Sequence, residues 1–249
     1  MSTRDVFIDD ICSALDEQGY CIVPSVIEPA EADRARTVLE GIVEDEITDT
    51  HRKEKKQRVG RIAVKHPVFL DLMCHPLIVE IWRKWLAPDI ICSTWSSITL
   101  YPGSPGHGGH PAWHTDYPYW SLENPWPSGK LTGQTIWLLD DFTEENGATG
   151  VVPYSQHKRT APTHANQWRE DARIITGERG SVAVLDGSLW HASTPNRSNR
   201  PRSALLGMYI RPCCLAQEDM RGQLADIKNP SELTRQLMGE NQYQPEDVK

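Results

Sequence analysis

The chain has 249 residues, a net charge of −8 and an isoelectric point near 5.6. This length suits one domain, because barrel-like folds routinely reach it as a single unit. The acidic balance argues against a general surface for nucleic acids or anionic membranes. No apolar run approaches the roughly 20 residues of a membrane-spanning helix, and the N-terminus lacks the apolar core of a signal peptide. We therefore expect a cytoplasmic protein that acts on a small molecule, in an oligomeric state that the sequence does not reveal.

The first third of the chain is predicted to be helical. Apolar residues follow the 3.6-residue period of an amphipathic helix from Phe7 to Leu15, and Gly19 supplies a stop signal. A short strand follows at 20–23, and a second helix is expected from about Pro29. The remaining helices of this part are expected at 68–74 and 76–86.

A basic stretch interrupts this helical part. Residues 51–61 contain six lysines or arginines and a single acidic residue, Glu54. Such a run is most simply interpreted as an exposed loop. The functional alternative is a lid that meets an anionic substrate.

From residue 90 onward the pattern is that of strands rich in β-branched and aromatic residues, separated by turns with Gly and Pro. The expected strands are 90–101, 132–139, 173–175, 181–185, 189–192 and 203–210. In the first of them Ser97, Thr99 and Tyr101 share one face, which either lines a solvated pocket or belongs to an edge strand.

Many short strands after a helical third indicate a mainly β protein. We expect a double-stranded β-helix (a jelly roll, cupin-like) with the N-terminal helices packed on one sheet. A single domain is expected over residues 1–249, with the jelly-roll core from about 90 to 211.

A candidate metal site is centred on His114 and Asp116. These residues are two apart at the end of an expected strand, so their side chains point to the same face. His191, on a distant strand, is the best candidate for a third ligand, whereas His107 and His110 are interpreted as loop histidines. Two imidazoles and one carboxylate form the facial triad of non-haem Fe(II) oxygenases, which leaves the opposite metal positions open. The H-x-D pair alone is a weak signal, because short strands contain it by chance.

A basic residue strengthens this interpretation. Arg202 stands eleven residues after His191, at the start of an apolar strand-like run. Its guanidinium can hold a dicarboxylate through a bidentate pair of hydrogen bonds. Arg197 and Arg200 are the alternatives, but they lie in a polar turn and are expected to be exposed.

Taken together, these motifs resemble the phytanoyl-CoA dioxygenase family of Fe(II)/2-oxoglutarate oxygenases. The resemblance covers about residues 19–211 and rests on the H-x-D pair, the distal His followed by Ala-Ser, the Arg beyond it and the acidic run 140–147. In 151–157 the family usually carries Pro-Gly-Ser-His, and this chain departs from it at Tyr154 and Gln156.

The resemblance implies that Fe(II) is bound by His114, Asp116 and His191, with 2-oxoglutarate and O2 as cosubstrates. It also implies that Arg202 pairs with the far carboxylate of 2-oxoglutarate. Ser193 lies on the same strand face as His191 and is expected to hydrogen-bond that carboxylate, as a Ser does in family members. A solvent-facing or strand-pairing role for this Ser is the alternative.

A further cosubstrate contact is expected on the strand 132–139. When the Asn-Gly turn after this strand is aligned with that of the family, Gln134 and Ile136 lie on the inner wall. Many members have tryptophan where this chain has Ile136, and here Trp137 follows one place later. Gln134 is therefore a candidate contact to the cosubstrate. Which residue of this chain replaces the contact that tryptophan makes in those family members stays open.

The implied activity is oxidation of a C–H bond of a small organic substrate, with release of succinate and CO2. Related halogenases replace the metal-binding carboxylate with a small residue, so Asp116 favours hydroxylation, desaturation or ring formation. One alternative is a cupin-type metal hydrolase or isomerase, which would not need Arg202; another is a non-catalytic jelly-roll binding protein. The substrate pocket is expected to be built from the loops 48–65 and 117–130 and the tail from Gln217. The sequences of these segments do not identify the substrate.

Overall fold

The computed structural model describes residues 3–106, 112–240 and 242, so His107 and His110 lie outside the described residues. The helices are α1 (Thr3–Gln18), α2 (Pro29–Glu46), α3 (Asp49–Glu54), α4 (Pro67–Met73), α5 (Pro76–Trp85), α6 (Met220–Leu224) and α7 (Glu232–Leu237), with the 3-10 turns η1 (Ile62–Val64), η2 (Tyr119–Ser121) and η3 (Ser155–Lys158). The strands are β1 (Tyr20–Val23), β2 (Lys56–Val59), β3 (Ile91–Leu100), β4 (Thr132–Leu138), β5 (Thr149–Val151), β6 (Arg173–Ile174), β7 (Val182–Asp186), β8 (His191–Ser193) and β9 (Arg202–Ile210).

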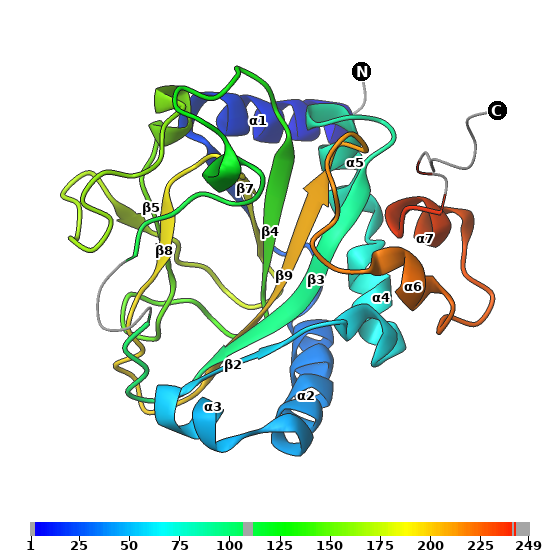
Figure 1. Ribbon diagram of the computed structural model, residues 1–249. Helices are drawn as coiled ribbons and strands as arrows, with labels where there is room; N and C mark the ends of the chain where they lie inside the picture. Colours follow the sequence, from blue (N-terminus) through cyan, green and yellow to red (C-terminus); the bar gives the residue numbers. More distant parts are fainter. Residues whose placement is uncertain (1–2, 107–111, 241, 243–249) are drawn as a thin grey trace.

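The strands form two antiparallel sheets. The large sheet has the order β1-β7-β4-β9-β3-β2, and the small sheet has the order β6-β5-β8. In Figure 1 the small sheet lies on one side of the large sheet, and α2, α4 and α5 lie on the other. This arrangement confirms the predicted jelly roll with N-terminal helices packed on one sheet.

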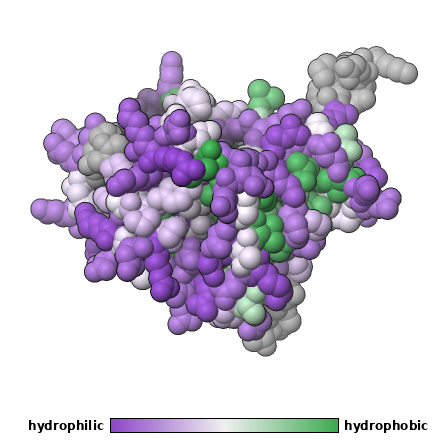
Figure 2. All heavy atoms as spheres, turned by 90° about the horizontal axis from the view of Figure 1, so that it is seen from below, coloured by the Kyte–Doolittle hydropathy of each residue, from purple (hydrophilic) through white to green (hydrophobic). Residues whose placement is uncertain are grey.

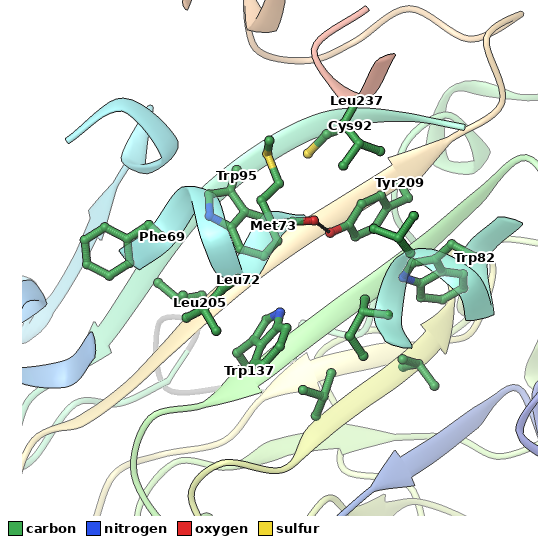
Figure 3. Packing of buried hydrophobic residues seen from close by; sticks show 14 of the residues in the cluster. Phe69, Leu72, Met73, Trp82, Cys92, Trp95, Trp137, Leu205, Tyr209 and Leu237 are labelled. Atoms are coloured by element: carbon green, nitrogen blue, oxygen red, sulfur yellow. Dashed lines mark hydrogen bonds between the residues drawn. The ribbon is translucent and has the colours of Figure 1, made fainter. Parts of the chain in front are cut away.

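The helices cover the large sheet through a core rich in aromatic side chains. Helix α5 begins with Pro76 at its first turn, and its buried residues recur at helical spacing. Trp82 of this helix lies on the sheet and donates from Nε1 to Thr135 Oγ1 at 2.9 Å. Tyr209 donates its hydroxyl to the Met73 carbonyl oxygen at 2.7 Å, as the dashed line in Figure 3 shows. Figure 3 also labels the neighbouring core residues Phe69, Leu72, Cys92, Trp95, Trp137, Leu205 and Leu237.

Glycines on this face of the sheet give the indole rings room. Gly207 pairs with Trp95 across β9 and β3, and a Cβ added there would overlap the indole ring. We expect Gly207→Ala to lower the free energy of unfolding by about 1–3 kcal/mol, because overpacking forces the ring out of place. Gly41→Ala is the matched control, since Gly41 is exposed in the middle of α2 with nothing near its added Cβ. That change should stabilise the protein by about 0.5–1 kcal/mol, and denaturant unfolding measures both.

The inner face of the large sheet packs toward the small sheet. Its buried apolar residues are Ile98, Leu100, Ile136, Leu138, Ala183, Leu185 and Ala204. They contact Val151, Ile175 and Leu189 from the small-sheet side, which closes part of the space between the sheets. The face of the molecule drawn in Figure 2 is mainly hydrophilic, with small separate hydrophobic patches. Among the described helices, none has the length and apolar character needed to cross a membrane.

One sequence-based expectation in this part is wrong, and one pair of alternatives is resolved. Residues 51–61 are not an exposed loop, because they contain the last part of α3 and the strand β2, which pairs with β3. The polar face of β3 does not belong to an edge strand, since β3 is flanked by β2 and β9. Thr99 and, just after the strand, Tyr101 line a hollow against α2, as the other alternative predicted. The Thr99 and Ser203 hydroxyls are hydrogen-bonded at 3.0 Å. Gln57, paired with Thr99, reaches from the same face to the Val43 carbonyl of α2.

A buried carboxyl at the end of β7 makes stability depend on pH. Burial raises the pKa of Asp186 to about 6, although Ser188 donates its backbone N–H and its hydroxyl to this carboxyl at 2.8 Å. The folded protein therefore binds this proton more tightly than the unfolded chain, whose carboxyl has a pKa near 4. The resulting stabilisation is complete below about pH 4 and is lost as the pH rises through 6.

Asp186→Asn should remove this loss, because an amide stays neutral and its oxygen still accepts from Ser188. Relative to the native protein, the unfolding free energy of the variant should rise by about 2 kcal/mol between pH 4.5 and pH 7.5. Denaturant unfolding at the two pH values measures the difference. An identical difference at both would show that Asp186 ionises normally in the folded state.

Candidate metal centre

Backbone pairing brings the two predicted histidine ligands together. The His114 N–H donates to the His191 carbonyl at 3.0 Å, and the His191 N–H donates to the His114 carbonyl at 3.0 Å. Their ring centroids are 4.2 Å apart. The segment that carries His114 forms this isolated bridge rather than the strand expected from the sequence. The alternation of side chains nevertheless persists, because the Asp116 N–H continues the pairing by donating to the Gly187 carbonyl at 2.8 Å.

The imidazole rings are oriented as metal ligands usually are. His114 Nδ1 lies 2.9 Å from the Ala112 carbonyl oxygen, and His191 Nδ1 lies 3.0 Å from the Leu189 carbonyl oxygen. A carbonyl accepts a hydrogen bond, so each contact favours the tautomer with its proton on Nδ1 and a lone pair on Nε2. His191 Nε2 is 3.7 Å from Asp116 Oδ1. The ligand atoms of the two histidines and Asp116 all lie within 4.8 Å of one another.

Asp116 has the electrostatics of a carboxylate that needs a cation. Its Oδ2 is buried and has no hydrogen-bond partner among the described residues. Burial raises the pKa of Asp116, while His191 and then Arg58 act to lower it. A divalent metal would supply the missing positive partner, and the neutral imidazoles with one carboxylate fit Fe(II). His114 is exposed, Asp116 half-buried and His191 buried, so the group is accessible from one side.

The segment after β5 fixes the position of His191. Ser155 Oγ accepts the Trp190 N–H at 2.8 Å, and Gln156 Nε2 donates to the Glu17 carbonyl at 3.1 Å at the end of α1. Tyr154 has φ of 65°, in the left-handed region where glycine is at home. This explains why glycine is usual at this position in the Pro-Gly-Ser-His pattern, and Tyr154 costs this chain about 1 kcal/mol or more. In this chain the segment 151–157 therefore holds in place the strand β8, which carries His191.

A cavity of about 390 Å3 between the two sheets contains the predicted site, and we call it the central cavity. The residues predicted from the sequence that line it are His114, Asp116, Gln134, His191, Ser193 and Arg202. Lys56 and Arg58, Trp120 and Gln217 also line it and belong to the three segments expected to build the substrate pocket. Thr94 and Thr149 line it too and were not expected there. The structure thus brings every predicted site residue to one cavity.

Arg202 is the buried cation of the central cavity. It is 3% exposed, donates from Nη2 to the Gly147 carbonyl, and has its guanidinium carbon 4.4 Å from the centre of the Phe142 ring. Burial lowers its pKa to about 10, against the opposing effect of Asp140, so it stays charged at neutral pH. Its Nε has no hydrogen-bond partner among the described residues. A buried guanidinium with an unused donor fits an anionic ligand.

The two smaller predicted contacts also face the central cavity. Gln134 is buried, and its Oε1 has no hydrogen-bond partner in the described part of the chain. Ser193 is half-buried and pairs with Thr149 through the backbone of β8 and β5. Ile136 lines the cavity as expected, whereas Trp137 points into the helix-covered core, with its ring 5.5 Å from that of His75. Trp137 therefore offers no contact to a molecule in the cavity.

A larger hollow of about 700 Å3 lies on the outer side, against α2. Several of its charged side chains pair with one another: Arg36 lies 3.2 Å from Asp33, and Arg179 lies 3.1 Å from Asp33. Arg179 also contacts Asp141 at 3.4 Å. Because these charges are already compensated and the metal-binding group lies elsewhere, the central cavity is the candidate site.

The sequence matches one family model and is similar to several named dioxygenases and a hydroxylase. The model of the family described as phytanoyl-CoA dioxygenase (PhyH) matches residues 15–204. An ectoine dioxygenase from Nocardia farcinica is 25% identical, and the match covers 79% of this chain and 76% of the relative. An L-proline trans-4-hydroxylase from Streptomyces griseoviridis is 27% identical, covering 78% of this chain and 82% of the relative.

Solved structures share the fold. The epimerase SnoN, in a complex with Fe3+, α-ketoglutarate and nogalamycin RO, gives a TM-score of 0.65 at 14% identity over 84% of this chain and 85% of that chain. The non-haem monooxygenase ThoJ gives a TM-score of 0.65 at 20% identity over 84% of this chain and 80% of that chain. At these identities the likeness shows a common architecture.

Proposed function

The chain belongs to the phytanoyl-CoA dioxygenase family and is a non-haem Fe(II)/2-oxoglutarate-dependent oxygenase, and from this premise we propose that it oxidises a C–H bond of a small organic substrate. The observation that carries the proposal is the convergence of His114, Asp116, His191 and Arg202 on one cavity. We also propose that residues 1–249 act as one catalytic domain. When bound, Fe(II) and 2-oxoglutarate supply an oxidative decarboxylation that releases succinate and CO2 and oxidises the substrate with O2.

The residues of the chain have distinct tasks in this proposal. His114, Asp116 and His191 hold the metal, and the carbonyl contacts at Nδ1 keep both imidazoles turned toward it. Arg202 binds the far carboxylate of 2-oxoglutarate, and Ser193 donates a hydrogen bond to the same group. Fixed in this way, the cosubstrate is oriented before the reaction begins, which reduces the entropy cost of bringing the reactants together.

Gln134, on β4 next to the strand β9 that carries Arg202, is proposed as a further polar contact to the cosubstrate. Its unpaired Oε1 and its place in the central cavity support this role. Its neighbour Ile136 presents an apolar surface where many relatives have tryptophan. The cosubstrate is therefore held by polar groups at its two ends and by an aliphatic wall along its length.

The identity of the carboxylate ligand bears on the outcome of the reaction. Asp116 takes the position that a small residue occupies in related halogenases. Its carboxylate therefore fills the metal position at which a halide would bind in those enzymes. We therefore propose hydroxylation or another oxidation, such as desaturation or ring formation. A cupin-type hydrolase or isomerase would have no use for a buried arginine in the cavity, and a non-catalytic binding protein would need none of the four residues.

A substrate screen tests the proposal. The protein is supplied with Fe(II), 2-oxoglutarate and O2, and succinate is measured with and without each candidate small molecule. We expect at least one compound to increase succinate release and to be recovered with a C–H bond oxidised. Product formed equally well without 2-oxoglutarate would contradict the assignment, because the oxidation would then have another source of electrons.

A further inference from the structure

The edge strand β2 places two cations in the central cavity. Lys56 pairs with Leu100, which in turn pairs with Arg202 on β9. Arg58 pairs with Ile98 one step further along the same face. Directly paired residues of antiparallel strands point to the same side, so both side chains face the cavity that contains Arg202.

These two cations have no carboxylate partner within 4 Å in the described part of the chain. Arg58 donates from Nε to Ser96 Oγ at 3.1 Å, which holds its stem against β3 and leaves the end of the guanidinium available. Lys56 is half-buried, and its pKa is lowered first by burial and then by Arg58, while Arg202 adds to the effect and Glu54 opposes it. Keeping positive groups together in this way is unfavourable unless an anion joins them.

The charges of the proposed complex point to the same need. Asp116 is the only carboxylate among the described residues that line the central cavity. Fe(II) and Arg202 are balanced by Asp116 and the two carboxylates of 2-oxoglutarate. Lys56 and Arg58 then remain as two positive charges beside the place where the substrate must enter.

We propose that Lys56 and Arg58 bind an oxyanion of the primary substrate, a carboxylate or a phosphate, and so place the reacting carbon near the metal centre. This inference rests on the proposed function. Arg58 lines the same cavity as His114, Asp116 and His191, so an anion held by Arg58 lies in the cavity that contains the metal-binding group. Trp120, which is 61% exposed and lines the same cavity, offers an aromatic surface for the uncharged part of the substrate.

A purely structural role for these charges makes a different prediction. Edge strands often carry inward-pointing charged residues, which prevent pairing with the sheet of another molecule. In that case neutral substitutions would promote self-association and leave anion binding unchanged. The two roles can therefore be separated by measuring both properties on the same variants.

The test uses protein loaded with Zn(II) in place of iron and saturated with 2-oxoglutarate. The probes are propionate and methylphosphonate, which distinguish a carboxylate from a phosphate, and propionamide serves as the neutral control. Dissociation constants are measured by saturation-transfer NMR, and the arginine Nε–Hε signals of labelled protein report which guanidinium responds. The variants are Lys56→Gln, Arg58→Gln and the double substitution, with Lys53→Gln, exposed on α3 and outside the cavity lining, as the matched control.

We expect an anionic probe to bind more tightly than propionamide and to shift the Arg58 signal. Each single substitution should weaken anion binding about tenfold and the double substitution about a hundredfold, as charge-assisted hydrogen bonds are lost. Lys53→Gln should bind as the native protein does. The affinity for 2-oxoglutarate, measured on the same samples, should stay within about threefold of the native value in all variants.

Three results would overturn the inference. The first is that neither anion binds better than propionamide. The second is that the double variant keeps the native anion affinity, with or without self-association. The third is that the substitutions weaken 2-oxoglutarate binding instead, which would assign the pair to the cosubstrate. A native protein that binds the anionic probes but never binds 2-oxoglutarate would contradict the proposed function and so separate its failure from that of the anion site.

Discussion

Asp116→Ala is expected to abolish substrate oxidation and to weaken Fe(II) binding by at least ten- to a hundredfold. Loss of a group that only orients a metal ligand costs about this much, so loss of a ligand itself should cost no less. Asp116 also supplies the one negative charge among the three clustered groups. The remaining His114 and His191 would supply the metal with only two ligands, both neutral.

An anaerobic titration of Fe(II) into the native and variant proteins measures this effect. Asp89→Ala is the matched control, because Asp89 is exposed and far from the lining of the central cavity. The control should bind iron and oxidise substrate as the native protein does. Full activity in Asp116→Ala, with the fold intact by circular dichroism, would rule out the metal-binding triad.

Arg202→Ala is expected to raise the dissociation constant for 2-oxoglutarate by tens- to thousandsfold. The loss of a desolvated bidentate charge pair costs on the order of 2–5 kcal/mol. Fe(II) affinity should change little, because Arg202 is not among the grouped metal-binding residues. Arg202→Lys should restore only part of the loss, since an ammonium cannot make the forked contact of a guanidinium.

The titrations need a control for folding, because Arg202 also contacts Gly147 and Phe142. Retained Fe(II) affinity and an unchanged circular dichroism spectrum in Arg202→Ala would show that the site is still assembled. Arg197→Ala is the matched substitution, since Arg197 is exposed in the turn before β9. An unchanged 2-oxoglutarate affinity in Arg202→Ala would remove the cosubstrate assignment and favour the hydrolase or isomerase alternative.

Much of the fold could be predicted because long elements leave a clear pattern in the sequence. The helix α5 has buried residues at helical spacing. The strands β4, β7 and β9 are buried along almost their whole length, and each is a short apolar run whose position was predicted to within a few residues. Strand β5 was missed because it has three residues, Thr149–Val151, too few to show a period. Its pairing with β8 fixes it in place.

The metal-binding group could be predicted for a different reason. Ligands two residues apart must share a face of an extended segment, so His114 and Asp116 were constrained by local geometry alone. His191 and Arg202 are distant in the sequence, so they could be named only as the best candidates for a third ligand and an anion contact, and their roles toward Fe(II) and 2-oxoglutarate came from the family resemblance. The structure brings them to the same cavity through the pairing of His114 with His191 and of β3 with β9.

Lys56 and Arg58 could be assigned to the cavity only as part of the segment 48–65, because β2 carries no apolar alternation that would single them out. The residues between and after them, Gln57 and Val59, face the helix-covered core, but a Gln in such a position looks like part of a polar loop. Its burial depends on two distant partners, the Val43 carbonyl and the Tyr101 hydroxyl. Tertiary hydrogen bonds of this kind leave no local pattern in the sequence.

The most direct test of the account is an anaerobic addition of 2-oxoglutarate to the Fe(II)-loaded protein, followed by visible absorption spectroscopy. The account predicts a weak charge-transfer band that saturates with 2-oxoglutarate in the native protein. Asp116→Ala should give no band, and Arg202→Ala should need tens- to thousandsfold more 2-oxoglutarate to reach half of its intensity. A native protein that binds Fe(II) but gives no band at saturating 2-oxoglutarate, or an Arg202→Ala titration identical to the native one, would contradict the central claim that the triad and Arg202 form one cosubstrate site.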